Sequence, residues 1–85
     1  MVEIVEKYYQ LSLKDLKPGE KGEIASFKGG GAVRKRLLGM GIVKGEIVEM
    51  EKVAPLGDPI QMMVKGYHLT LRKNEAESVI VRRVI

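Results

Sequence analysis

The sequence predicts a mainly β domain: a small, strongly bent barrel of five strands with a short helix between the first two. Two observations support this prediction. Residues 60–64 and 67–71 keep their apolar positions in register across a two-residue turn, as an antiparallel hairpin requires. Five short strand-like runs are separated by turns that contain glycine, proline or charged residues. At 85 residues, the chain has the length of a single domain.

The domain is expected to cover residues 11–85, preceded by an N-terminal extension at residues 1–10. The expected elements are, in order, a single helical turn near Leu13, a strand at 22–27, a short helix from Ala32, strands at 47–53, 60–64 and 67–71, a second single turn near Asn74, and a last strand at 78–84.

The first of these elements follow from short local signals. Ser12 and Asp15 lie at the spacing of a capping box, which is typical of a helix start. A Pro-Gly turn at 17–20 then leads to the strand at 22–27. Glycines at 29–31 precede the helix, but the Lys and Ser/Thr of a phosphate-binding loop do not follow at the required spacing. A flexible turn is therefore favoured over a nucleotide site.

The short helix is predicted to be apolar on one side. Val33, Leu37 and Leu38 recur at helical spacing, whereas the cations at 34–36 lie on the other side. Glycines on either side of Met40 permit the positive φ that a helix exit needs.

Alternation defines the strands of the second half. Across 47–53, Val48 and Met50 face one side while Glu49 and Glu51 face the other. If 65–66 is a two-residue turn, three apolar pairs share one face of the next hairpin: Val64 with Tyr67, Met62 with Leu69, and Ile60 with Leu71. The strand at 78–84 is mixed in polarity, which suggests partial burial on both sides.

The composition excludes several classes of protein. Cysteine is absent, so the chain has no disulfide, thiol nucleophile or thiolate metal site. Residues 1–10 contain two glutamates and do not resemble a secretory signal, and no apolar run is long enough to cross a bilayer. These features predict a soluble, cytoplasmic protein. The net charge of +4 is ordinary for a soluble domain and also suits an acidic partner.

The sequence predicts neither catalysis nor a dedicated metal site or cofactor. No Ser-His-Asp arrangement or carboxylate pair at a recognisable motif spacing occurs. His68, the only histidine, could join Glu49, Glu51 or Asp58 in a weak site for Fe(II) or another divalent ion. The hairpin register places His68 on the polar face, however, so a solvent-facing strand histidine is the favoured interpretation.

Two stretches are candidate contact surfaces for another protein. Residues 24–45 contain several cations and no acidic residue. Within them, Arg34 and Arg36 would bind an acidic patch, and Leu38 and Met40 would add apolar contacts. Leu38 could equally belong to the core, and the cations could be a solvated helix face.

The second candidate surface is the loop at 54–59, whose two prolines fix φ and make it rigid. Leu56, Gly57 and Asp58 form its tip. Leu56 is either tucked beneath the loop or presented to a partner.

Taken together, these residues resemble the FeoA family, ferrous iron transport protein A, the small cytosolic companion of the membrane permease FeoB. The resemblance covers residues 11–84 and depends most on the combination of two runs, Arg36-Leu37-Leu38-Gly39-Met40-Gly41-Ile42 and Ala54-Pro55-Leu56-Gly57-Asp58-Pro59-Ile60. Shorter matches are Leu11-Ser12 with Leu16, Lys17-Pro18-Gly19, Gly66-Tyr67, Leu69-Thr70-Leu71-Arg72 and Glu75-Ala76.

The resemblance implies an SH3-like barrel, in agreement with the five strands predicted from the residues themselves. It also implies a cytosolic accessory protein of bacterial ferrous iron uptake, which binds and regulates the cytoplasmic region of FeoB at the inner face of the membrane. The N-terminal region of FeoB is a GTPase, and either regulation of that GTPase or gating of the permease would fit.

Two other functions compete with this one. A nucleic-acid-binding small barrel would use the basic residues at 28–36 to contact phosphates, but aromatic residues are scarce and glutamates follow closely, so no nucleic-acid partner is expected. A chaperone that carries Fe(II) to the permease is the other alternative.

Overall fold

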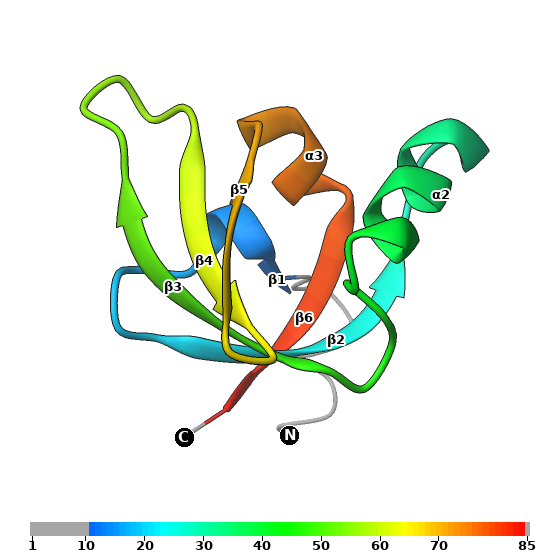
Figure 1. The fold of residues 1–85 in the computed structure, drawn as a ribbon, viewed down its shortest axis with the longest axis horizontal. Helices are drawn as coiled ribbons and strands as arrows, with labels where there is room; N and C mark the ends of the chain where they lie inside the picture. The colour runs from blue at the N-terminus through cyan, green and yellow to red at the C-terminus, as the bar shows by residue number, and fades with distance from the viewer. Residues whose placement is uncertain (1–10, 85) are drawn as a thin grey trace, which may run out of the picture.

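The computed structural model describes residues 11–84, which form one bent antiparallel sheet with short helical segments (Figure 1). In chain order the elements are β1 (Leu11–Ser12), the 3-10 turn η1 (Leu13–Asp15), β2 (Lys21–Phe27), α2 (Gly31–Gly39), β3 (Ile47–Val53), β4 (Ile60–Val64), β5 (Tyr67–Leu71), α3 (Lys73–Glu77) and β6 (Val79–Val84). The strand order is β1-β6-β2-β3-β4-β5. The predicted mainly β fold is confirmed, with the two-residue β1 added to the five expected strands. The extension predicted at 1–10 lies outside the described residues.

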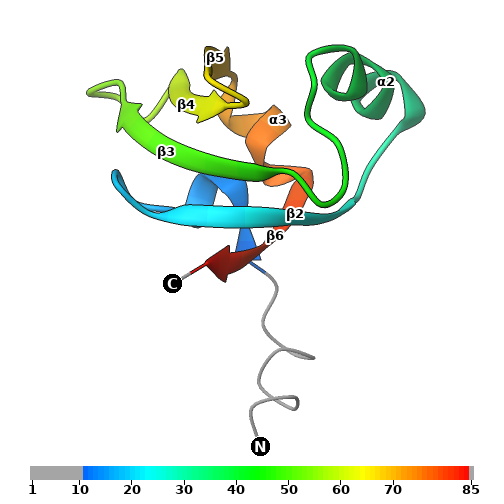
Figure 2. The same ribbon diagram turned by 60° about the horizontal axis from the view of Figure 1, so that its bottom comes forward.

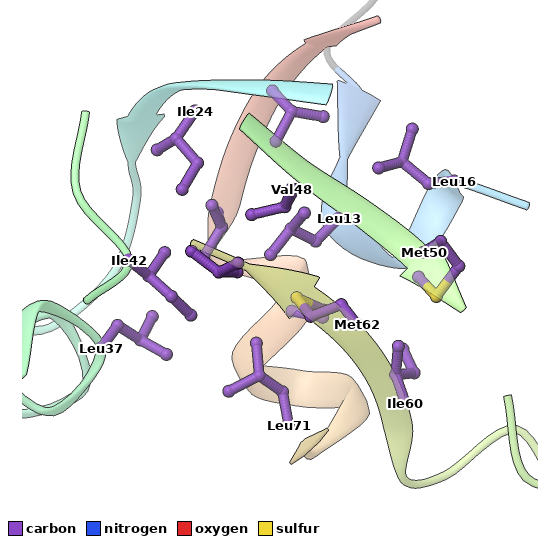
Figure 3. Packing of buried hydrophobic residues seen from close by; sticks show 14 of the residues in the cluster. Leu13, Leu16, Ile24, Leu37, Ile42, Val48, Met50, Ile60, Met62 and Leu71 are labelled. Atoms are coloured by element: carbon purple, nitrogen blue, oxygen red, sulfur yellow. The ribbon is translucent and has the colours of Figure 1, made fainter. Parts of the chain in front are cut away.

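The inner face of the sheet encloses a single apolar core. Its buried side chains come from every strand, from η1 and from both helices: Leu11, Leu13, Leu16, Ile24, Leu37, Ile42, Val48, Met50, Ile60, Met62, Val64, Leu71, Ala76, Val79 and Val81. Leu13, Val48 and Met62 are fully buried near the middle of this cluster, whereas Leu37 and Ile42 occupy the end beside α2 (Figure 3). One core therefore connects the helices to the sheet.

The β4–β5 hairpin has the register that the sequence predicts, with Val64 opposite Tyr67, Met62 opposite Leu69 and Ile60 opposite Leu71. Lys65 and Gly66 both have positive φ, as the two central residues of a type I′ turn require. Tyr67 lies on the predicted face but is 68% exposed. β5 is the last strand in the sheet order and Tyr67 adjoins the turn, so the core does not extend over its ring.

Two features of β2 allow the sheet to bend. The register between β2 and β6 shifts between Ile24 and Ser26, and such a bulge increases the local twist. Near the start of β2, Gly22 brings the backbone against β6, since a Cβ at this position would lie 3.1 Å from the Val81 side chain. Figure 2 shows β2 and β3 curving together beneath the helices. The sheet thus wraps around the core.

The two predicted single helical turns are present, and a carboxylate closes each of them. In η1, the Ser12 N–H donates to Asp15 Oδ2 at 2.9 Å, as the capping-box spacing predicts. In α3, the Arg72 N–H donates to Glu75 Oε1 at 2.9 Å. Both short turns are therefore held by side-chain bonds at their first residues.

Helix α2 differs from the predicted helix in how it is buried. Of the three residues expected to form its apolar side, only Leu37 is buried; Val33 is 37% and Leu38 41% exposed. The helix projects beside the sheet (Figures 1 and 2), so only a narrow stripe of it faces the core. Gly41 adopts the expected positive φ after the helix, whereas Gly39 remains helical.

Candidate functional site

A cleft with a volume of about 390 Å³ brings together residues from both predicted contact surfaces. It lies between α2, the loop joining β3 and β4, and the start of α3, which occupy the same edge of the barrel (Figure 1). Its lining consists of Arg36, Asp58, Pro59, Thr70, Leu71, Arg72 and Glu75. The sequence predicts Arg36 and Asp58 as members of separate surfaces, and the fold places them on the same cleft.

Arg36 has a structural role as well as a position on the cleft. Its guanidinium forms an ion pair with Glu75, a carboxylate that is only 6% exposed. The other Glu75 oxygen accepts the backbone N–H of Arg72. Glu75 therefore links α2 to the start of α3, and Arg36 neutralises a carboxylate that would otherwise be buried without a countercharge.

The remaining predicted residues of the helix surface differ in accessibility. Arg34 is exposed, with its guanidinium 5.8 Å from the centre of the Phe27 ring. This is a cation–π distance. The sequence leaves open whether Leu38 belongs to the core or is available to a partner. Leu38 is partly exposed, so it is not a core residue. Met40 is half-buried and packs against the core cluster, which leaves only part of its side chain for a partner.

The loop between β3 and β4 is closed by its own backbone. The Ala54 N–H donates to the Pro59 carbonyl at 3.0 Å, and the Gly57 N–H donates to the Ala54 carbonyl at 2.7 Å. Gly57 has φ +89°, a conformation that favours glycine. Leu56 is 96% exposed at the tip. Leu56 is therefore not tucked beneath the loop, and its contact with a partner stays a prediction.

Asp58 connects this loop to α3, since its Oδ1 accepts the Lys73 N–H at 3.1 Å. A second hollow of about 280 Å³ is also lined by Pro59. Its walls are largely apolar and include Val53, Ala54 and Pro55. Pro59 therefore borders both a charged cleft and a more apolar hollow, and Leu56 lines neither of them.

His68 lies on the outer face of the hairpin, as predicted. Its Nδ1 is 2.8 Å from Glu51 Oε1, and the Gln61 side-chain amide donates to the same oxygen at 3.2 Å. The hydrogen bond from His68 is the main cause that lowers the pKa of Glu51 below its ordinary value, and the bond from Gln61 acts in the same direction. Within residues 11–84, no group of three or more His, Cys, Asp or Glu side chains is placed to hold a metal ion.

A family model described as the FeoA domain matches residues 11–83. The chain belongs to the FeoA family. The solved structure of FeoA from Chlorobium tepidum is 40% identical with a TM-score of 0.82, covering 88% of this chain and 71% of that one. The FeoA-like protein from Clostridium acetobutylicum is 33% identical with a TM-score of 0.83, covering 89% and 88%. These neighbours confirm the SH3-like fold.

One curated relative in the FeoA family is larger. It is the Fe(2+) transport protein A/Fe(2+) transporter FeoB fusion protein of Porphyromonas gingivalis, which is 32% identical over 74 residues. The match covers 87% of this chain and 9% of that relative, so the chain spans about a tenth of the length of the fusion protein.

Of the residues that line the cleft in this FeoA-family chain, the sequence predicts only Arg36 and Asp58 as site residues, and it misses the charged pair Arg72 and Glu75. A cleft formed by a helix, a loop and a turn from distant parts of the chain has no sequence signal. The only local hint is the spacing of Arg72 and Glu75, which sit at the N-cap and the third position of α3.

Within the described residues, no helix combines the length and apolar character needed to span a membrane.

Proposed function

We propose that this FeoA-family chain is an accessory protein of ferrous iron uptake, which binds the cytoplasmic region of FeoB and regulates it without catalysing a reaction. The relative from P. gingivalis supports the pairing, because its name joins Fe(2+) transport protein A and the transporter FeoB in one polypeptide. Fusion holds two modules at a high effective concentration, which is useful for modules that act together.

The exposure of Leu56 is the observation that favours the loop as the main contact. A leucine that is 96% exposed contributes nothing to the core, and the loop that carries it is fixed by hydrogen bonds. Because the loop is already ordered, binding costs little conformational entropy. Burying this side chain in a partner would contribute about 1.5–3 kcal/mol.

Helix α2 would supply the electrostatic part of the contact. Its Arg34 and Lys35 are exposed, and residues 24–45 carry no acidic side chain. An acidic patch on FeoB would be attracted to this region, with the charges acting mainly on the rate of association and on specificity. The cleft lies between helix and loop, so a partner that contacts both would cover Arg72 as well.

The test is calorimetric titration of the full chain with the purified cytosolic region of FeoB from the same organism. Leu56→Ser should weaken binding by about tenfold or more, since about 1.4 kcal/mol corresponds to a factor of ten. Tyr67→Ser is the matched control, because Tyr67 is another exposed apolar side chain and lies at the start of β5, beside the β4–β5 turn, outside the proposed contact. Equal effects of the two substitutions would remove the loop from the interface.

The helix is tested with Lys35→Glu, and Arg82→Glu on β6 serves as the charge-matched control. Arg36→Glu is unsuitable, because it would place two carboxylates together at Glu75. Lys35→Glu should slow association and reduce its salt dependence, whereas Arg82→Glu should have a smaller effect. If the wild-type chain shows no binding to FeoB, the proposed function is wrong.

A further inference from the structure

Three polar side chains from adjacent strands meet on the outer face of the sheet. Glu51 comes from β3, Gln61 from β4 and His68 from β5. The Glu51 Oε1 atom is 2.8 Å from His68 Nδ1 and 3.2 Å from Gln61 Nε2. None of the three lines the cleft described above. Their convergence has no role in the proposed contact with FeoB.

We propose that Glu51, Gln61 and His68 form an exchangeable surface site for a divalent first-row transition ion. The donor set consists of an imidazole nitrogen, a carboxylate oxygen and an amide oxygen, which suits ions from Fe(II) to Zn(II). The Gln61 amide is the third donor group, in addition to the two that His68 and Glu51 supply.

The spacing of the donors fits such an ion. Metal–ligand bonds of about 2.1 Å at right angles place neighbouring ligand atoms about 3 Å apart, and the two observed separations of 2.8 and 3.2 Å lie on either side of this value. The ion would replace the proton between His68 and Glu51, and the imidazole would bind in its neutral form. Rotation of the Gln61 amide by half a turn would present its oxygen in place of its nitrogen.

A β-bulge explains how the carboxylate reaches the other two groups. Along the β3–β4 pair, Met50 lies opposite Met62 and Lys52 lies opposite Gln61, so Glu51 is the extra residue between them. Bulges redirect side chains and occur often beside functional sites. Here the bulge brings the Glu51 carboxylate to both Gln61 and His68.

The charges around the site favour weak binding and fast exchange of the divalent ion. Among the described residues, Glu51 is the only carboxylate in contact with His68, and the neighbouring Lys52 interacts electrostatically with Glu51 and opposes a second cation. The His68 side chain is 62% exposed, so water would complete the coordination and exchange freely.

The experiment is a titration of the full chain with Co(II), which neighbours Fe(II) in the affinity series, followed by NMR. His68 is the only histidine, so the imidazole signals have one source. Wild type should show a saturable change centred on His68. His68→Asn and Glu51→Gln should each weaken the affinity by about tenfold or more, whereas Gln61→Glu should strengthen it by about tenfold.

Glu49→Gln is the matched control, because it removes a carboxylate from the same strand two positions from Glu51 and should change the affinity least. The amide spectrum of each variant verifies its fold. The proposal is overturned if Co(II) produces no saturable change at His68, if His68→Asn binds as tightly as wild type, or if Gln61→Glu does not tighten binding. The readout uses the metal alone, so it is independent of whether the chain binds FeoB.

Discussion

The β4–β5 hairpin and helix α2 differ in how many of their predicted apolar side chains are buried. In the hairpin, Ile60, Met62, Val64 and Leu71 are all buried on the face that their alternation predicts. In α2, a single residue, Leu37, enters the core. Successive strand residues point to opposite sides by covalent geometry, so pairing two strands decides the environment of each residue. A short helix presents side chains all round, and the stripe that becomes buried depends on what it packs against.

The first prediction tests this contrast with truncations in the core. Met62→Ala in the hairpin and Leu37→Ala in α2 should each lower the free energy of unfolding by about 2–5 kcal/mol, because both side chains are fully buried. Leu38→Ala, the neighbouring truncation on the exposed side of α2, should cost less than about 1 kcal/mol. Urea unfolding followed by circular dichroism measures all three. Similar losses for Leu37→Ala and Leu38→Ala would show that the two sides of the helix are not distinct.

The second prediction concerns the charged connection of α2. Arg36→Ala should lower the free energy of unfolding by about 1–3 kcal/mol, because it leaves the buried Glu75 carboxylate without its ion pair. Arg34→Ala is the control on the same helix and should cost less than about 1 kcal/mol, since Arg34 is exposed where it contacts Phe27. Urea unfolding provides the comparison, and equal losses for the two arginines would argue against a structural role for Arg36.

The third prediction concerns the turn of the hairpin. Lys65 has φ +53°, in the left-handed region that lysine rarely adopts and asparagine tolerates. Lys65→Asn should therefore raise the free energy of unfolding by about 0.5–1 kcal/mol, as an Asn-Gly pair suits a type I′ turn. Gly66→Ala should act in the opposite direction, because Gly66 also has positive φ. Thermal unfolding of both variants measures the effects, and stabilisation by Gly66→Ala would contradict the turn assignment.

Most of the sheet could be predicted from the sequence because its signals are local. Alternation specified β3, and alternation together with a two-residue turn specified the register of β4 and β5. The two-residue β1 was not predicted, since two residues carry no pattern and its pairing with β6 depends on the whole fold. Tyr67 shows a further limit: alternation gives the face of a residue and leaves open whether the core extends that far.

The candidate site was predicted only in part. Arg36 and Asp58 were named from their own segments, but their shared cleft depends on tertiary packing. Glu75 was missed because its importance comes from burial against a helix distant in the chain. For Leu56, the sequence left the tucked and the presented positions open, since the same loop residues fit both. The sequence allows His68 to pair with Glu49, Glu51 or Asp58, and the bulge that selects Glu51 has no local signature.

The smallest effect on stability is expected at the tip of the β3–β4 loop, in contrast to the buried side of α2. Leu56→Ser should change the free energy of unfolding by less than about 0.5 kcal/mol, because the side chain is 96% exposed and the hydrogen bonds that close its loop come from the backbone. The same polar substitution at Leu37 would disrupt the packing of α2 against the core, because Leu37 is fully buried. Thermal and urea unfolding of Leu56→Ser, compared with wild type, measure the difference. A loss above about 1 kcal/mol would mean that Leu56 packs within the domain; an unchanged stability combined with weakened FeoB binding would assign the side chain to recognition alone.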